Sequence, residues 1–174
     1  MVTQCRSPSL VRSTPPSTTA ATQASDALIV LVKADFKPAT DVLSRLIADA
    51  RKCGDLDATP AKLLSVWRAQ GVTSARVVLV SIGEGHARLV RQAVSAAVTS
   101  LKSAAPKKIT LCLPDGSQHR LQAAAQAVAD ASYVYTATKP SAKAALLSRV
   151  VLALPTAAQT KAAKDDFAHA CAHV

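Results

Sequence analysis

Short, continuously apolar runs alternate along the chain with longer segments in which apolar residues recur every three or four positions. The run from Ala27 to Val32 is bounded by charged residues, which is typical of a strand covered on both faces. Similar runs occur at Arg76 to Ile82, Ile109 to Leu113 and Val150 to Leu152. The pattern therefore predicts a sheet whose strands are largely buried.

The intervening segments have helical periodicity. Thr40 can cap a first helix, which ends at Cys53-Gly54 and places its apolar residues on one face: Val42, Leu43, Leu46, Ile47 and Ala50. The segment from Ala87 to Ser103 has the clearest apolar stripe, with Arg88, Arg91 and Lys102 on its opposite side. An alanine-rich helix is predicted from about His119 to Ala131, and the residues after Lys161 are helical in composition.

Strands that alternate with helices predict a three-layer αβα domain. Leu63 to Trp67 and Arg76 to Ile82 are also strand-like, and the Gln70-Gly71 turn between them is too short for a parallel crossover. The predicted fold is thus α/β, with a mixed, mostly parallel sheet. Trp67, the sole tryptophan, is interpreted as a packing residue and not as a stacking platform.

Residues 1–25 differ from the rest in composition. Serine, threonine, proline, alanine and glutamine dominate, and Pro15-Pro16 interrupts any helix across the middle. We predict a disordered tail whose removal leaves thermal stability nearly unchanged. The segment lacks the apolar core of a secretory signal, and an organellar transit peptide is the alternative interpretation.

Positive charge is concentrated in the second half of the chain. The formal net charge is +10, and the stretch from Pro60 to Lys164 holds 14 basic residues against Glu84, Asp115 and Asp130. Such a field attracts polyanions. The outer face of the 87–103 helix, with Arg88, Arg91 and Lys102, is the candidate basic surface. Because no set of aromatic residues accompanies the bases, we expect weak polyanion binding that is lost at physiological salt. A solvated face is the alternative.

Two further clusters are candidate ligand sites. Gly83-Glu84-Gly85 follows a strand and opens a helix, where free amide groups could hold a phosphate, but Arg88 breaks the full glycine motif. A tight turn that needs positive φ is the alternative. His169 and His173 lie one helical turn apart, and Asp165 lies one turn earlier, so the three could chelate a metal ion. The alternative there is an ordinary chain end.

Cysteine usage favours a reducing compartment. The four cysteines, Cys5, Cys53, Cys112 and Cys171, lie far apart and form no C-x-x-C pair. Cys112 is interpreted as a small core residue. No run reaches the length of a membrane span.

Three segments resemble the N-terminal domain of the leucyl aminopeptidase family, the M17 metallopeptidases. They are the opening strand Asp26 to Val32, the strand, loop and helix start from Ala75 to Gly85, and the passage from Ala129 to Lys139. Lys164 to Val174 is similar to the start of the helix that links the two domains of that family. The implied division is a tail over 1–25, a domain over 26–158 and the start of a linker helix over 159–174.

The resemblance implies a macro-like, non-catalytic domain. The family's motifs that carry metal ligands and catalytic residues, including "N-T-D-A-E-G-R-L", are absent from this chain, so no catalytic residue is assigned. The two divalent metals, zinc or manganese, would belong to a catalytic domain that begins after Val174, and this chain alone is expected to be inactive. The implied partners are that domain or full-length homologues in a hexamer, and the implied location is the cytoplasm. The alternative function is a free-standing basic module for a nucleotide, ADP-ribose or nucleic acid.

Overall fold

The computed structural model describes residues 9–10, 17–115, 117–132, 147 and 149–154. Within these residues a single sheet has the order β1-β6-β5-β2-β4-β3. Its strands are β1 Ser9–Leu10, β2 Ala27–Val32, β3 Leu63–Trp67, β4 Arg76–Ser81, β5 Lys108–Cys112 and β6 Arg149–Ala153. The helices are α1 Ser17–Thr22, α2 Val42–Lys52, α3 Ala87–Leu101 and α4 Gln118–Ser132, with a 3-10 turn, η1, at Lys102–Ala104.

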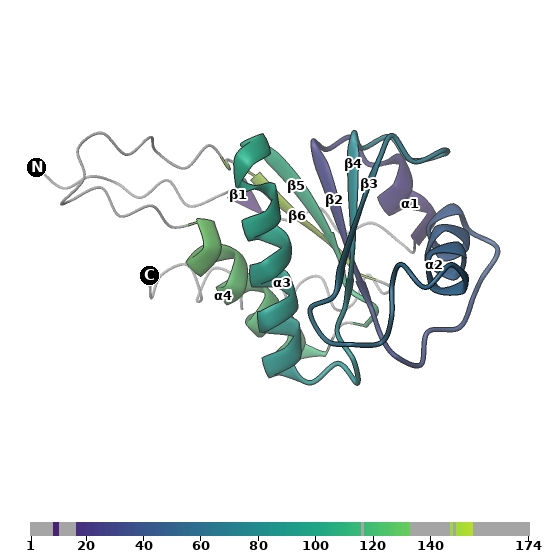
Figure 1. Ribbon diagram of the computed structural model, residues 1–174. Coiled ribbons are helices and arrows are strands. Elements are labelled where there is room, and N and C mark those ends of the chain that lie inside the picture. Colours follow the sequence, from purple (N-terminus) through teal and green to yellow (C-terminus); the bar gives the residue numbers. More distant parts are fainter. Residues whose placement is uncertain (1–8, 11–16, 116, 133–146, 148, 155–174) are drawn as a thin grey trace, which may run out of the picture.

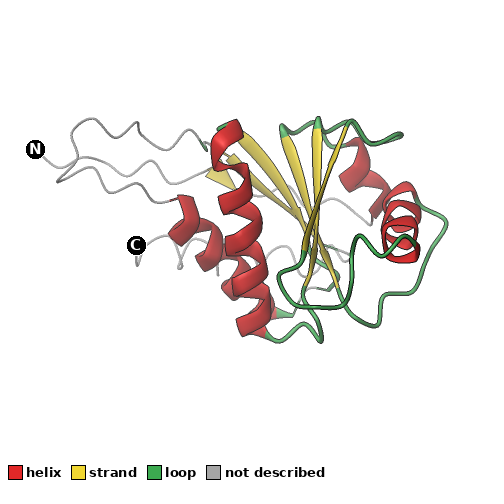
Figure 2. Ribbon diagram, viewed as in Figure 1, coloured by secondary structure: helices red, strands yellow, loops and turns green. Residues whose placement is uncertain are grey.

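The elements form three layers. Helices α3 and α4 pack together on one side of the sheet, and α1 and α2 lie on the other (Figures 1 and 2). All neighbouring strands are parallel except β3, which pairs antiparallel to β4. The structure confirms the predicted α/β fold with a mixed, mostly parallel sheet, and it confirms the antiparallel pair that the short 68–75 link required.

The central strands bury both of their faces. In β2, Ile29 and Leu31 face the core beneath α3 and α4, whereas Leu28 and Val30 face the core beneath α1 and α2. Strand β4 alternates in the same way. All six side chains of β2 are buried. This two-sided burial explains why the sequence of β2 is a continuous apolar run and not an alternating one.

Helix α2 begins one residue later than its sequence predicts. The N-cap is Asp41 and not Thr40, and the Asp41 carboxylate accepts a hydrogen bond of 3.1 Å from the backbone N–H of Ser44. Both residue types can cap a helix, and an aspartate adds a favourable interaction with the helix dipole. The predicted end is confirmed, because Cys53 is the C-cap and Gly54 has a φ of 80°.

The prediction that residues 1–25 form a disordered tail is wrong for the part that the structure describes. Strand β1 pairs with β6, and α1 packs beside α2 with Ala20 and Ala21 buried. The backbone N–H of Thr73 also donates to the carbonyl of Ala21 at 2.8 Å. Ala20 and Ala21 belong to the core that Leu43 and Ile47 of α2 form with the sheet, and this packing accounts for the order of the segment.

Candidate functional site

Two adjacent parallel strands send their following loops in opposite directions. After β2 the chain runs to α2 on one face of the sheet, and after β5 it runs to α4 on the other face (Figure 1). Such a reversal opens a crevice at the carboxyl ends of the strands, which is where open α/β sheets bind ligands. Lys33 and Asp115 lie in these two loops, so the topology brings a base and an acid to this place.

Ion pairs join the loops at this switch point. The Asp115 carboxylate accepts a hydrogen bond from the Arg120 guanidinium and lies 3.9 Å from the Lys33 ammonium. Arg120 also donates through Nε to the carbonyl of Gly85, which follows β4. A Cβ atom at Gly85 would stand 3.4 Å from both Arg120 Cζ and Lys33 Cε. The cluster therefore joins the ends of β2, β4 and β5 and fills the position that a ligand takes in other α/β proteins.

The Gly83-Glu84-Gly85 loop is a tight turn. Gly83 and Gly85 have φ values of 55° and 80°, which confirms the predicted need for positive φ. The N–H of Gly85 donates to the carbonyl of Ile82 at 2.9 Å, so this amide is already engaged. Glu84 is exposed, and its carboxylate lies 3.0 Å from Nε2 of His86. Phosphate binding at this loop stays a prediction.

Alanine substitutions can distinguish the cost of positive φ at Gly83 from the cost of steric contact with Pro60. Gly83→Ala is expected to lower the free energy of unfolding by about 2–3 kcal/mol, of which about 1 kcal/mol is the cost of positive φ. The rest arises because a Cβ atom would lie 3.1 Å from Cγ of Pro60. Gly54→Ala is the matched control, since Gly54 has a φ of 80° and nothing within 4 Å of the added atom.

Chemical denaturation of the two variants measures both losses. The control is expected to lose about 1 kcal/mol. Equal losses in the two variants would show that Pro60 does not restrict the loop.

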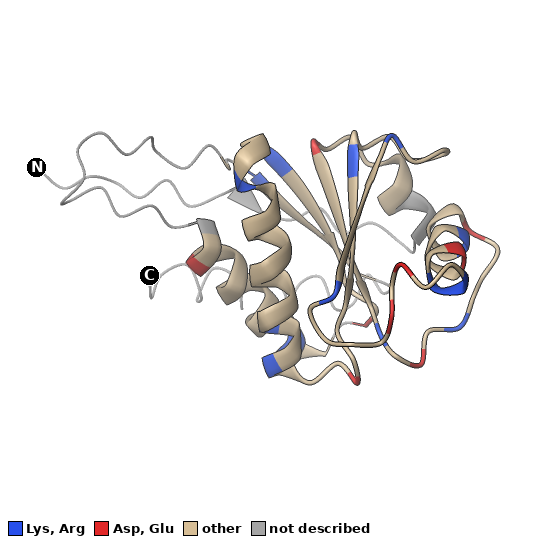
Figure 3. Ribbon diagram, in the orientation of Figure 1, with Lys and Arg blue, Asp and Glu red and all other residues tan. Residues whose placement is uncertain are grey.

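The predicted basic surface is interrupted. Arg88 is exposed near the start of α3, and Lys102 lies past its end in η1, with uncharged residues over much of the length between (Figure 3). Nη2 of Arg91 is 2.8 Å from Oδ2 of Asp130 on α4. The structure thus places Arg88 and Arg91 on α3 and Lys102 just after it, and pairs Arg91 with an acid. Polyanion binding there stays a prediction.

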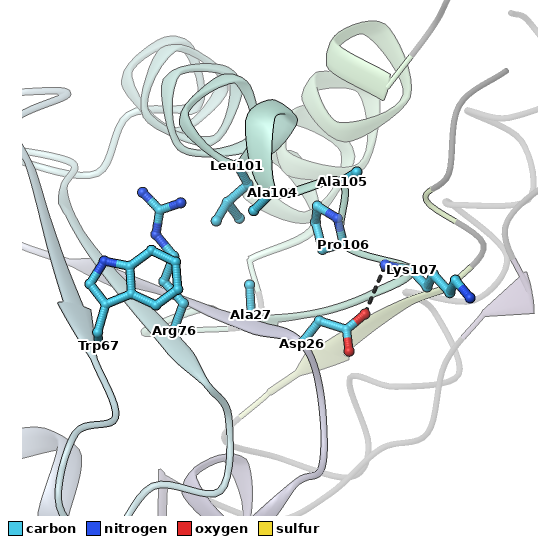
Figure 4. A pocket seen from close by; sticks show the side chains of 9 residues that line it. All are labelled: Asp26, Ala27, Trp67, Arg76, Leu101, Ala104, Ala105, Pro106 and Lys107. Atoms are coloured by element: carbon cyan, nitrogen blue, oxygen red, sulfur yellow. Dashed lines mark hydrogen bonds between the residues drawn. The ribbon is translucent and has the colours of Figure 1, made fainter. Parts of the chain in front are cut away.

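Trp67 is not the packing residue that the sequence suggested. Its side chain is 63% exposed, and the Arg76 guanidinium lies 4.9 Å from the centroid of its ring. The two line a hollow of about 440 Å³ at the amino end of the sheet, together with Asp26, Ala27, Leu101, Ala104, Ala105, Pro106 and Lys107 (Figure 4). Position 67 ends an edge strand, where one side of the residue faces solvent. The alternation of apolar and polar residues shows which face of a strand is buried, but it does not show whether the strand lies at the centre or at the edge of the sheet.

The described residues contain no group of three His, Cys, Asp or Glu side chains that could hold a metal ion. The carboxylates of Glu84, Asp115 and Asp130 lie on separate elements, each beside a base. The candidate ligands Asp165, His169 and His173 lie outside the described residues. No helix in the described part of the chain is long and apolar enough to cross a membrane.

Cys112 packs at the core beneath α1 and α2. Burial raises the pKa of its thiol to about 12, and the negative charge of Asp41 contributes further. The thiol is therefore protonated at neutral pH, whereas nucleophilic cysteines need a lowered pKa. We assign Cys112 a structural role.

The fold is that of a three-layer α/β domain with one antiparallel edge strand. Residues 27–142 match the N-terminal domain of the cytosol aminopeptidase family, and the chain belongs to this family. It is 45% identical over 148 residues to a probable cytosol aminopeptidase of Acidovorax sp. (strain JS42), a match that covers 84% of this chain and 29% of that protein. A probable cytosol aminopeptidase of Albidiferax ferrireducens is 42% identical over 147 residues, with 84% and 31% covered. The chain thus spans less than a third of these relatives.

Solved structures share the fold. A tomato leucine aminopeptidase mutant superposes with a TM-score of 0.66 at 16% identity, covering 98% of this chain and 38% of that one. The bottromycin maturation enzyme BotP superposes with a TM-score of 0.60 at 22% identity, covering 84% of this chain and 30% of that one. At these identities the likeness concerns the fold alone.

Proposed function

We propose that this chain acts as the non-catalytic N-terminal domain of a leucyl aminopeptidase. The parent activity would be the metal-dependent release of amino acids from the N-termini of peptides. The observation that carries the proposal is the match of residues 27–142 to the N-terminal domain of the family, within relatives of which the chain spans only 29–31%. The name of those relatives supports a cytosolic location.

The chemistry of the described residues supports a non-catalytic role. Two-metal hydrolysis needs several carboxylates that converge on ions about 3.5–4 Å apart. The described carboxylates after Pro60, those of Glu84, Asp115 and Asp130, lie instead on separate elements and pair with Lys33, His86, Arg91 and Arg120. The described residues do not fit a zinc or manganese pair. We therefore assign the metals to a catalytic domain, which would be the partner of this one, in the same polypeptide or in a full-length homologue of a hexamer.

A domain exchange tests whether the chain can serve such an enzyme. In the exchange, residues 26–154 replace the matching region of the Acidovorax relative, and leucine amide hydrolysis is compared with that of the intact relative. We expect the chimera to fold and to retain at least a tenth of the intact activity, because the two domains are 45% identical. The matched control is the relative without its N-terminal region. A folded chimera that is no more active than this control would contradict the proposal.

The alternative is a free-standing basic module for a nucleotide, ADP-ribose or nucleic acid. The structure offers less support for it, because the Gly85 amide is engaged and Arg91 pairs with Asp130. The alternative still makes a distinct prediction: affinity for DNA or RNA should fall steeply as the salt concentration rises. A sub-micromolar complex that persists at about 0.15 M salt would favour the binding module.

A further inference from the structure

Strand β3 ends the sheet, and its outer edge carries peptide groups that point away from β4. Ser81 donates its N–H to the carbonyl of Lys62, and Arg68 donates its N–H to the carbonyl of Ala75. The N–H and C=O groups of successive residues point to opposite sides of a strand. Leu64 and Val66, which alternate with Lys62 and Arg68, therefore bond to β4 as well. The N–H and C=O groups of Leu63, Ser65 and Trp67 therefore face outward. No described residue bonds to them through its backbone.

Both ends of this edge are sharply defined. At the start, Ser81 accepts from the N–H of Ala61 and donates to the carbonyl of Lys62, and Ala61 has a φ of 63°. This is a β-bulge of the type that normally places glycine at the first position. At the other end, Arg68 has a φ of 49°. The two left-handed residues limit the straight edge to β3 itself, which suits a short docked segment.

Trp67 gives this edge an apolar anchor. Its ring is mostly exposed, although tryptophan is the largest apolar side chain in the protein, and Arg76 covers one part of it. The adjoining hollow of about 440 Å³ has an apolar wall formed by Leu101, Ala104 and Pro106 (Figure 4). Tryptophan and arginine beside a cavity are the residues that dominate binding energy at protein interfaces. A side chain of a segment bound outside β3 would contact the exposed part of the Trp67 ring, and the hollow lies on the other side of this ring.

The basic side chains beside β3 favour a partner segment that carries negative charge. Exposed Lys62 and Arg68 flank β3, and Arg76 lies next to its end. Asp57, on the loop before β3, carries the opposite charge. Hydrogen bonds from Thr59 lower the pKa of its carboxyl, and nearby Lys62 lowers this pKa by a smaller amount. In a second copy paired antiparallel through Ser65, Lys62 would lie opposite Arg68, and like charges in such a pair repel. A segment with carboxylates at these two positions would be attracted.

We propose that the outer edge of β3 binds an extended segment of a partner protein, with an acidic residue on each side of a short apolar stretch. The segment adds a strand to the sheet through the outward groups of Leu63, Ser65 and Trp67, a common mode of peptide recognition. The carboxylates pair with Lys62 and Arg68, and an apolar side chain packs on Trp67. This inference does not depend on the parent enzyme's activity.

A synthetic peptide and the sole tryptophan provide the test. The probe is acetyl-Glu-Val-Thr-Val-Thr-Val-Glu-amide, whose acids have the same spacing as Lys62 and Arg68. The control peptide has lysine in place of both glutamates. We expect the acidic peptide to shift the emission of Trp67 to shorter wavelength in a saturable way, because the peptide covers an exposed indole. The lysine peptide is expected to bind at least ten times more weakly.

Two variants probe the backbone and the charges separately. Ser65→Pro removes one outward N–H and no backbone bond to β4, and is expected to weaken binding of the acidic peptide at least tenfold. It also removes the hydroxyl that accepts a hydrogen bond of 3.0 Å from Nη2 of Arg76 on β4, so Ser65→Ala, which loses only this hydroxyl, is its control. Lys62→Glu with Arg68→Glu is expected to reverse the preference between the two peptides. Arg45→Glu with Lys52→Glu, on exposed positions of α2, is the matched control and should leave the preference unchanged. Circular dichroism checks that each variant is folded.

Several results would overturn the proposal. Equal binding of the two peptides would exclude selection by charge, and an unchanged preference in the Lys62 and Arg68 double variant would exclude these cations. Self-association that Ser65→Pro abolishes would assign the edge to a second copy of the chain. Tight binding of single-stranded DNA that shifts the same emission would assign it to nucleic acid.

Discussion

Replacing Leu79 with alanine is expected to lower the free energy of unfolding by about 3–4 kcal/mol. Leu79 lies in the middle of β4, is fully buried, and contributes to the core beneath α1 and α2. Strands β2 and β3 flank it, with Val30 and Leu64 as its register partners. The surrounding sheet cannot collapse into the space, so the cost of a cavity adds to the lost burial of the side chain.

Leu64→Ala is the matched control for this prediction. Leu64 stands opposite Leu79 on β3, but it is only partly buried because β3 is an edge strand. We expect a loss of about 1–2 kcal/mol in urea denaturation, with an unchanged dependence on denaturant. If Leu64→Ala cost as much as Leu79→Ala, β3 would be covered by another part of the protein, and the docking edge would be lost.

Removing residues 1–25 is expected to lower the melting temperature by roughly 5 °C, which corresponds to about 2 kcal/mol for a domain of this size. The deletion uncovers the core beside α2 by removing Ala20 and Ala21. It also removes the acceptor for the Thr73 N–H and the Ser25 hydroxyl that lies 2.8 Å from the Ser74 hydroxyl. Ser74 is buried, so its loss of a partner adds a desolvation cost.

A shorter deletion tests which part of residues 1–25 contributes to thermal stability. Removing residues 1–16 deletes β1 but keeps α1 and the hydrogen bonds of Ser25. We expect it to lower the melting temperature by less than half as much as the 1–25 deletion does. Differential scanning calorimetry of the three proteins measures both changes. A melting temperature that is unaffected by the 1–25 deletion would restore the disordered tail that the composition predicted.

Much of the fold could be predicted from local pattern. The runs at β2 and β4 are apolar at every central position because both faces of the sheet are covered. The stripe on α3 was equally clear, since Val90, Val94 and Leu101 are all fully or almost fully buried. Helix α1 could not be predicted, because alanine, serine and threonine carry no periodic signal, and Ala20 and Ala21, which the structure shows to be buried, are small. Its order depends on tertiary packing.

The candidate site was harder to predict than the fold. Lys33, Asp115 and Arg120 are separated in sequence, and each alone resembles a solvated surface residue. They meet because β2 and β5 become neighbours, which depends on strand order and not on local composition. The available signal is that Lys33 directly follows a buried strand and Asp115 follows another within three residues. Trp67 was misjudged because no pattern within β3 shows that this strand is an edge.

Leucine amide hydrolysis by the purified chain tests the central claim most directly. We expect no turnover above the blank, with or without added Mn²⁺ or Zn²⁺, because the described residues hold no cluster of metal ligands and the carboxylates of Glu84, Asp115 and Asp130 lie apart, each beside a base. A leucine aminopeptidase assayed in parallel confirms that the assay works. Metal-dependent turnover that keeps a constant specific activity through further purification would contradict the account, and it would place a catalytic centre within this chain.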